Sequence, residues 1–151
     1  MKEDAYTEAI HAYFNAVLRL RQVFRQKVQK ELTELGYSDI SMEMSQVLYY
    51  IHFMAKDRKS NQQDIANRTG KNKSSVTALI DNLVKKGLID RSVDPNNRRN
   101  NIISLTAAGL AFVEEIYDKV YGAFALSKAN TSIREITEMT AVMENLMESD
   151  I

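Results

Sequence analysis

The sequence of 151 residues has no cysteine, no tryptophan and a single proline. Without cysteine the chain has no disulfide scaffold, no thiolate zinc site and no cysteine redox switch, which is typical of a cytoplasmic protein. It also lacks an apolar run near the length of about 20 residues that a membrane-spanning helix needs. Its first residues lead into an amphipathic segment instead of the apolar core of a signal peptide. We therefore predict a cytoplasmic protein with no membrane partner.

The chain also lacks a net charge, since 20 basic side chains balance 20 acidic ones. The two signs are nevertheless separated along the sequence. Residues 56–101 contain 11 Lys and Arg against 5 Asp and Glu, whereas the other residues contain 9 against 15. A basic middle between acidic ends favours a central surface for a polyanion such as nucleic acid. A solvated charged face without a partner is the alternative interpretation.

Apolar residues recur at alternating steps of three and four in four stretches, which predicts amphipathic helices there. These stretches run from Tyr6 to Phe24, from Met44 to Met54, from Leu110 to Phe124 and from Ile133 to Met147. Glycines that favour a left-handed helix end follow three helix-like segments, at Gly36, Gly70 and Gly87. Side chains suited to capping a helix start occur at Ser41, Ser60, Thr106 and Ser132, the second and last within capping-box patterns.

The spacing of apolar residues changes to every second residue between Gly87 and Thr106, which predicts a β-hairpin. Its two strands flank a polar stretch, residues 94–101, that contains the only proline and predicts a turn or loop. Two short helices, over residues 61–69 and 73–86, precede the hairpin and are joined by a tight turn. The predicted fold class is therefore mainly α with a small β-hairpin wing: a winged helix-turn-helix flanked by N- and C-terminal helices.

The helix predicted over residues 73–86 has two different sides. The stripe expected to be buried consists of Val76, Leu79, Ile80 and Leu83. The other side of its first two turns carries the small residues Ser74, Ser75, Thr77 and Ala78. Small hydroxyl side chains let the backbone approach DNA and bond to bases or phosphates, and the N-terminal part of such a helix reads the major groove. Ordinary polar helix surface is the alternative interpretation.

Basic side chains flank this helix and occupy the hairpin tip. Lys71 and Lys73 lie where phosphates would border the helix, and Arg98 and Arg99 lie in the polar stretch of the hairpin. A guanidinium at such a tip can enter a narrow minor groove, where the negative potential is enhanced. The alternative is that the two arginines only keep a loop soluble.

Five short motifs of this chain resemble those of the MarR (multiple antibiotic resistance regulator) family of transcriptional regulators. They are Gln63-Asp64-Ile65-Ala66, Lys73-Ser74-Ser75-Val76-Thr77, Leu83-Val84-Lys85-Lys86-Gly87-Leu88-Ile89, Asp94-Pro95-x-x-Arg98-Arg99 and Ser104-Leu105-Thr106-x-x-Gly109. Each motif alone is a weak signal, but the five together in this order and spacing are specific. One position departs from the family, whose wing commonly carries Asp-x-Arg, because Asn97 stands where that Asp is expected before Arg99.

The resemblance implies a single domain over residues 1–151 that binds a pseudo-palindromic operator in double-stranded DNA as a homodimer. Residues 1–36 and 106–151 would form the dimerisation helices, and residues 41–105 the DNA-binding region. The implied role is repression of transcription, with release by a small aromatic or phenolic effector. The predicted DNA-binding residues are Ser60, Gln62, Lys71, Asn72, Lys73, Ser74, Ser75, Thr77, Ala78, Arg98 and Arg99.

Four further residues are candidates for an effector pocket at the junction of the first, second and fifth predicted helices: Tyr13, Tyr49, His52 and Phe53. Ordinary core packing is the alternative for them. The two histidines, His11 and His52, have no cysteine and no tight carboxylate cluster nearby in the sequence, so we predict no metal site. No other cofactor is predicted.

Two other classes of function compete with DNA binding. A winged-helix protein–protein interaction module without a DNA role is the first, and the basic, hydroxyl-rich turns of the helix over residues 73–86 disfavour it. An enzyme is the second. It is not predicted, because the sequence has no nucleophile–base pair, no Gly-rich phosphate loop and no metal constellation.

Overall fold

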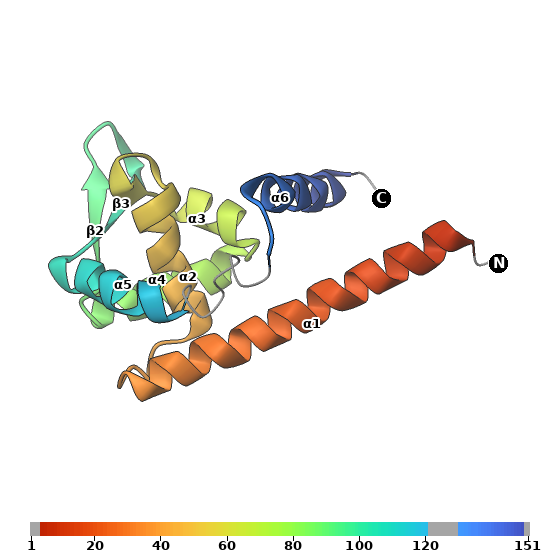
Figure 1. Ribbon diagram of the computed structural model, residues 1–151. Helices are drawn as coiled ribbons and strands as arrows, with labels where there is room; N and C mark the ends of the chain where they lie inside the picture. The colour runs from red at the N-terminus through yellow and green to blue at the C-terminus, as the bar shows by residue number, and fades with distance from the viewer. Residues whose placement is uncertain (1–3, 121–129, 150–151) are drawn as a thin grey trace.

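The computed structural model describes residues 4–120 and 130–149, and these confirm a mainly helical fold with a small sheet (Figure 1). The elements in chain order are α1 (Ala5–Glu34), α2 (Met42–Tyr49), the π-helical turn η1 (Tyr50–Met54), the 3₁₀ turn η2 (Lys56–Arg58), β1 (Lys59–Ser60), α3 (Gln62–Thr69), α4 (Lys73–Lys85), β2 (Ile89–Asp94), β3 (Asn97–Leu105), α5 (Ala107–Val120) and α6 (Ile133–Glu148). The predicted continuation of α5 to Phe124 lies outside the described residues. No described helix is both long and apolar enough to cross a membrane.

Capping side chains begin α2, α5 and α6 as the sequence predicts. The hydroxyls of Ser41, Thr106 and Ser132 accept backbone N–H groups three residues further on, at 3.1, 3.0 and 3.1 Å. Gly70 ends α3 in the left-handed conformation, with φ of 66°, where a residue with a Cβ would be strained. These local signals therefore place the helix boundaries correctly.

The predicted capping box that starts at Ser60 is wrong. Asn61 caps α3 instead, because its Oδ1 accepts the backbone N–H of Asp64 at 2.8 Å. Ser60 belongs to β1 and pairs with Ile103 of β3. It therefore lies in a strand, one residue before the cap position of α3. Its residue surface is only 9% exposed.

One antiparallel sheet contains the three strands in the order β1–β3–β2. β1 is two residues long, and no pattern in the sequence predicts it. On the other side of β3, Arg91 of β2 pairs with Ile103, which gives that residue a neighbour on both sides. The side chain of Ile103 is fully buried, so the central strand anchors the wing in the core.

The tip of the wing is tighter than the predicted loop over residues 94–101. Only Pro95 and Asn96 form the turn, and β3 already begins at Asn97. Val93 of β2 pairs with Asn101 of β3, but the next residue of β2, Asp94, pairs with Asn97. Residues 98–100 therefore have no partners in β2, and they form a bulge that turns this part of the strand outward.

The helix predicted to reach Met54 changes to η1, one π-helical turn in which the Ala55 N–H donates to the Tyr50 carbonyl at 2.9 Å. The wider turn shifts the helix face, so Met54 is 67% exposed instead of buried. Asp57 and Arg58 follow with left-handed φ values of 56° and 54°. This reversal brings the chain back to start β1.

A close contact joins α5 to the base of the wing. A Cβ at Gly109 would lie 2.0 Å from the carbonyl oxygen of Leu88, so only glycine fits without movement of the backbone. The same carbonyl accepts the Thr106 N–H at 3.1 Å, and the Thr106 hydroxyl donates to the carbonyl of Gly87 at 2.6 Å. The motif Thr106-x-x-Gly109 therefore holds the start of α5 directly against the start of β2.

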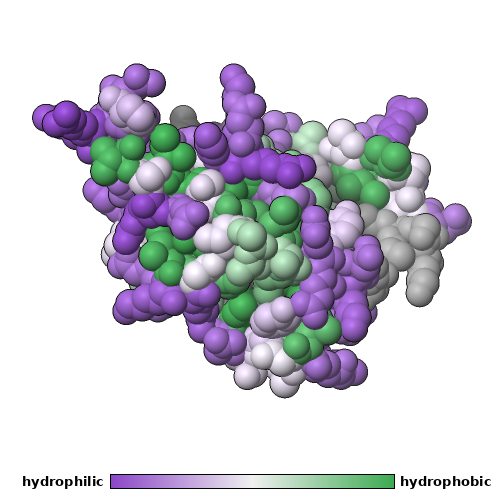
Figure 2. All heavy atoms as spheres, turned by 90° about the vertical axis from the view of Figure 1, so that its left-hand side faces the viewer, coloured by the Kyte–Doolittle hydropathy of each residue, from purple (hydrophilic) through white to green (hydrophobic). Residues whose placement is uncertain are grey.

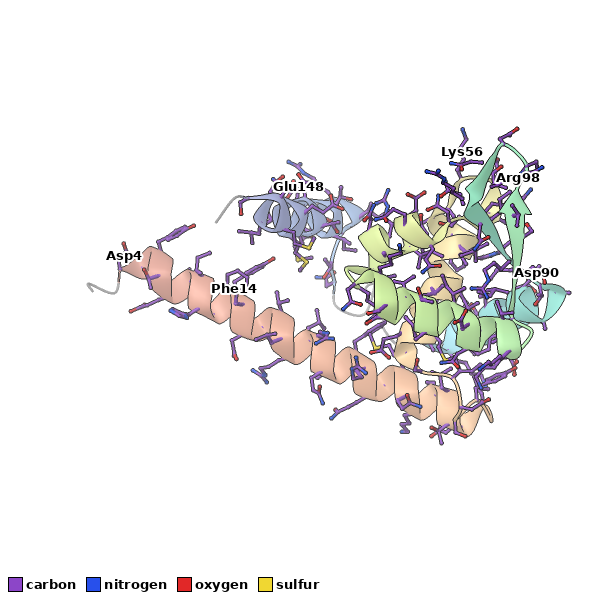
Figure 3. All side chains as sticks on the ribbon, turned by 180° about the vertical axis from the view of Figure 1, so that it is seen from behind. Asp4, Phe14, Lys56, Asp90, Arg98 and Glu148 are labelled. Carbon is purple, nitrogen blue, oxygen red and sulfur yellow. The ribbon has the colours of Figure 1, made fainter. Side chains whose placement is uncertain are left out.

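The hydrophobic core lies between the C-terminal end of α1, the helices α2 to α5 and the sheet. In α1 only Val28 and Leu32 are buried, and α6 contains no buried residue. The N-terminal part of α1 extends away from this core, and α6 lies on the same side as that extension (Figures 1 and 3). Two helices therefore leave most of their apolar residues outside the core.

Candidate nucleic-acid interface

The turn between α3 and α4 fixes where α4 begins. Asn72 Oδ1 accepts the backbone N–H of Ser75 at 2.9 Å and the hydroxyl of Ser74 at 2.8 Å. The predicted DNA contact Asn72 therefore caps α4 with this oxygen. Lys73 is exposed and Lys71 is half-buried, and both lie beside the N-terminus of α4, which carries a positive partial charge. This end of α4 is consequently suited to an anion such as a phosphate group.

The two sides of α4 differ as the sequence predicts. Val76, Ile80 and Leu83 are fully buried, and Leu79 is half-buried against the same core. The predicted base-reading side consists of Ser74, Ser75 and Ala78, which are exposed, and Thr77, which is half-buried. The buried stripe thus orients the helix so that its small residues face outward.

Thr77 and Gln62 meet between α3 and α4. The Gln62 side chain donates from Nε2 to the Thr77 hydroxyl, which itself donates to the Lys73 carbonyl at 2.9 Å. Gln62 and Thr77 are both predicted DNA contacts, but no pattern in the sequence indicates that they bind each other. The pair ties the first residue of α3 to the second turn of α4.

The arginines of the wing are exposed on the bulge of β3. Asn97, which stands where the family commonly has Asp, accepts the backbone N–H of Arg99 through Oδ1 at 3.2 Å. The turn is fixed further by the Asn96 N–H, which donates to Asp94 Oδ1 at 2.9 Å. Asn97 therefore holds the backbone of the bulge, and hydrophilic side chains extend from this end of the molecule (Figure 2).

A hollow of about 180 Å³ opens between α3, α4 and the wing. Its lining includes Gln62, Lys73, Arg99 and Asn100. The wing is far from α3 and α4 in the sequence, yet these four side chains are all polar or basic, and Ala66 is the one apolar residue of the lining. The structure thus brings three predicted residues, Gln62, Lys73 and Arg99, together around one hollow.

Ser60 is the exception among the predicted DNA-binding residues, because its pairing in β1 leaves it buried. Three exposed basic residues just before it have no role predicted from the sequence: Lys56, Arg58 and Lys59. Lys56 lies on the same side of the molecule as Arg98 (Figure 3). The signal available in the sequence is their share in the basic middle, but their placement depends on the left-handed turn of η2.

An ion pair connects α1 to the helix-turn-helix. Arg25 of α1 binds Glu43 of α2 through its guanidinium. Burial raises the pKa of Glu43, but hydrogen bonds from its own backbone and from Arg25, together with the charge of Lys71, outweigh that effect and lower the pKa overall. Glu43 therefore stays ionised between a cation of α1 and a cation of the turn before α4.

Residues 38–100 of the chain match the family model that describes the MarR family. The uncharacterised HTH-type transcriptional regulator YdcH of Bacillus subtilis is 29% identical over 116 residues, which cover 72% of this chain and 77% of that protein. The HTH-type transcriptional repressor YetL of the same organism is 26% identical over 96 residues, which cover 64% of this chain and 58% of that protein.

The solved structures extend this similarity to most of the chain. MepR of S. aureus in its DNA-binding conformation superimposes with a TM-score of 0.76 at 25% identity, over 89% of this chain and 96% of MepR. A MepR–DNA complex gives a TM-score of 0.69 at 27% identity, over 91% of this chain and 98% of MepR. The central residues 38–100 thus match the MarR family, and the fold of the described residues is that of MepR.

Three aromatic rings meet beside a second hollow. Tyr49 stacks on Phe53 with ring centroids 5.8 Å apart, and Tyr117 of α5 lies 5.0 Å from Phe53. A hollow of about 560 Å³ beside them is also lined by Arg68 of α3 and Glu144 of α6. Tyr49 and Phe53 thus lie together as predicted, whereas the sequence predicts Tyr117 only as part of an apolar helix face.

Tyr49 borders two hollows. One of about 150 Å³ lies at the predicted junction of α1, α2 and α5, with Phe24 and Val120 in its lining. The larger one, which also contains Phe53, lies between α2, η1, α3, α5 and α6. Tyr13 of α1 is not part of either. It lines a separate hollow with residues of α6, among them Met139 and Val142. His52 contacts the edge of Phe53 at 4.4 Å, and its buried Nδ1 has no hydrogen-bond partner among the described residues. The described residues contain no group of three or more His, Asp or Glu side chains placed to hold a metal ion.

Proposed function

We propose that this protein is a transcriptional regulator of the MarR family that binds double-stranded DNA sequence-specifically, with α4 in the major groove and the wing in the minor groove. The observation that carries the proposal is the division of α4 into a buried apolar stripe and an exposed side of small residues. Basic residues border that side at both the turn and the wing. The similarity to MepR, which has been solved with DNA, supports the same interpretation.

Each predicted contact receives a role from its position. Lys71 and Lys73 bind phosphates beside the N-terminus of α4, while Ser74, Ser75 and Ala78 meet base edges. Arg98 and Arg99 reach the minor groove from the bulge of the wing. Asn72 fixes the start of α4, and Gln62 and Thr77 complete the surface. We leave Ser60 out of this set, because it is buried in the sheet.

We further propose that the protein works as a homodimer. The reading head, residues 38–120, buries most of its apolar residues within one chain; its exposed large ones are Phe53, Met54, Val93 and Tyr117. The arms, residues 5–27 of α1 and residues 133–148 of α6, instead expose theirs: Tyr6, Phe14, Leu18, Leu20, Val23, Ile133, Met139, Val142 and Met147 are 44–85% exposed. Stripes this long are covered most simply by the arms of a second copy. Two reading heads related by a two-fold axis then match a pseudo-palindromic operator.

Binding of such a dimer to a promoter blocks RNA polymerase, so repression is the regulatory outcome that we propose. YetL, a relative of similar sequence, is named a repressor. A protein that reads chromosomal DNA works in the cytoplasm, which is where we place this one. Catalysis has no part in this proposal.

An effector site is proposed in the hollow beside Tyr49, Phe53 and Tyr117. The three rings offer an apolar surface for an aromatic or phenolic molecule, and Arg68 offers a charge for an acidic group. The walls come both from α3 of the reading head and from α6 of the arms. A ligand bound there is therefore able to change the separation of the two heads, which is how we propose that it releases DNA.

Selection from a pool of random DNA duplexes by the full chain tests the DNA-binding proposal. We expect an inverted repeat to emerge, bound with an affinity that falls steeply with salt because phosphate contacts release counterions. A control duplex with scrambled half-sites should bind more weakly and keep a similar salt slope. If no duplex is enriched and binding has no salt slope, the chain is a protein-interaction module instead of a DNA-binding regulator.

A further inference from the structure

The hydroxyl of Thr77 has no hydrogen left to offer to DNA. A threonine hydroxyl donates one hydrogen bond, and here it donates to the carbonyl of Lys73 at 2.9 Å. The amide of Gln62 approaches the same oxygen. Since the hydroxyl is already a donor elsewhere, it can only accept from that amide. The NH₂ end of Gln62 must therefore face Thr77.

This constraint fixes the orientation of the Gln62 amide. With Nε2 directed to Thr77, the carbonyl Oε1 points away from the contact, and no described residue donates a hydrogen bond to it. Gln62 lines the open hollow between α3, α4 and the wing, in which Lys73 and Arg99 also lie. The free acceptor is thus held on the side of the molecule that is proposed to face DNA.

An amide oriented in this way matches one base in the major groove. Adenine presents an N6 amino donor next to the N7 acceptor, and a glutamine side chain pairs with both through its Oε1 and one N–H. Nε2 has two hydrogens, so one serves Thr77 and the other remains for N7. Guanine presents two acceptors at the same edge, and Oε1 would be repelled by its O6.

We propose that Gln62, held in place by Thr77, reads an adenine in the major groove of each half-site. The inference rests on the proposed function and adds a specific base to it. Thr77 is a positioning residue, which acts through Gln62 and through its bond to the Lys73 carbonyl. The sequence-reading part of the site therefore extends from α4 to the first residue of α3.

The test compares the full-length wild type with Gln62→Ala, Thr77→Val and Thr77→Ser in selection from random duplexes, followed by affinity measurements on the selected site. We expect Gln62→Ala to lose the preference for adenine at one base pair per half-site, by roughly 5- to 150-fold, the usual range for a bidentate contact. Thr77→Val keeps the shape but removes the hydroxyl, so it should lose much of the same preference. Thr77→Ser keeps the hydroxyl and should retain it.

A matched control is Asn67→Ala, because Asn67 is exposed on the same helix, α3, but does not line the hollow that contains Gln62. This variant should select the wild-type site. Replacement of the adenine by 7-deazaadenine removes the N7 acceptor, and it should weaken wild-type binding but leave Gln62→Ala unchanged. Melting temperatures of all variants should stay close to wild type, since Gln62 and Thr77 are half-buried and neither belongs to the hydrophobic core.

Three results would overturn the inference. The first is that Gln62→Ala selects the same bases as wild type. The second is that it weakens all duplexes equally, as expected for a phosphate contact, and the third is that Thr77→Val leaves the preference intact. Each of these is distinguishable from failure of the proposed function. In that case the wild type itself would enrich no sequence, whereas here it would still select an inverted repeat.

Discussion

The reading head and the arms follow the same helical periodicity but bury their apolar residues differently. In the head, Ile65, Val76 and Ile116 are completely buried within one chain. On the arms, Tyr6 and Ile133 remain 73% and 85% exposed. An apolar stripe in a sequence thus predicts that a helix face will be covered, but not whether the same chain covers it. The head covers most of its apolar residues by itself, and the arms are where we propose that a second copy packs.

The largest effect is expected from a cavity in the head. Leu83→Ala should destabilise the fold by about 2–5 kcal/mol, because Leu83 is fully buried and its neighbours can close the gap only in part. Denaturant unfolding measures this difference. The matched change is Leu18→Ala, at an arm residue that is 65% exposed in the single chain. It should lower the unfolding free energy of the head much less. Equal destabilisation by the two variants would remove the distinction between head and arms.

A charge on the arms should weaken the dimer and leave the stability of the head unchanged. Leu20→Glu places a carboxylate on the exposed apolar stripe of α1, and burial of an unpaired charge in the dimer contact should weaken association by roughly tenfold or more. Sedimentation velocity at micromolar concentration measures the change. Asn15→Glu is the control, because 3.6-residue periodicity places Asn15 on the opposite side of the helix. A wild-type chain that sediments as a stable monomer while binding operator tightly would contradict the assembly.

The wing should affect binding with little effect on stability. The double change Arg98→Ala and Arg99→Ala removes exposed side chains from a bulge, so the unfolding free energy should stay within about 0.5 kcal/mol. Affinity for the selected duplex should fall, and the salt slope should flatten by about one unit for each phosphate that the variant no longer binds. Arg19→Ala, on the outer side of α1, should leave both unchanged. An unaltered affinity and slope for the double variant would mean that the wing does not touch DNA.

Local chemistry explains why much of the head is predictable. The caps Ser41, Thr106 and Ser132 and the left-handed end at Gly70 depend on residues only a few positions apart, so the sequence carries the full signal. The buried stripe of α4 is predictable for the same reason. Asn61 takes the place of Ser60 as the cap because a distant residue, Ile103, holds Ser60 in a strand.

The features that the sequence does not predict depend on tertiary contacts. The two-residue strand β1 exists only because β3 lies beside it, and the bulge of residues 98–100 follows from the register between β2 and β3. Tyr13 is wrongly grouped with Tyr49 in the sequence-based prediction, because the path of α1 takes it to α6 instead. The contact of Gln62 with Thr77 likewise joins two helices whose packing the sequence does not specify. Site chemistry is therefore predictable by residue type, and site geometry is not.

The smallest effect is expected at the link between arm and head, the ion pair of Arg25 with Glu43. The pKa of Glu43 is lowered below its usual 4.5, so its ionised form stabilises the folded state above the unfolded pKa, and this contribution is lost as the pH falls through the folded pKa. Glu43→Gln should therefore lower stability near pH 7 by less than about 1 kcal/mol, since the Arg25 and Glu43 side chains are still 39% and 22% exposed. The difference from wild type should disappear in acid below the pKa of the native carboxyl. Unfolding curves at a series of pH values measure it, and the double change with Arg25→Ala isolates the pair from the separate attraction between Glu43 and Lys71. If the difference persists in acid, Glu43 acts through packing, and the arm is attached to the head by the buried Val28 and Leu32 alone.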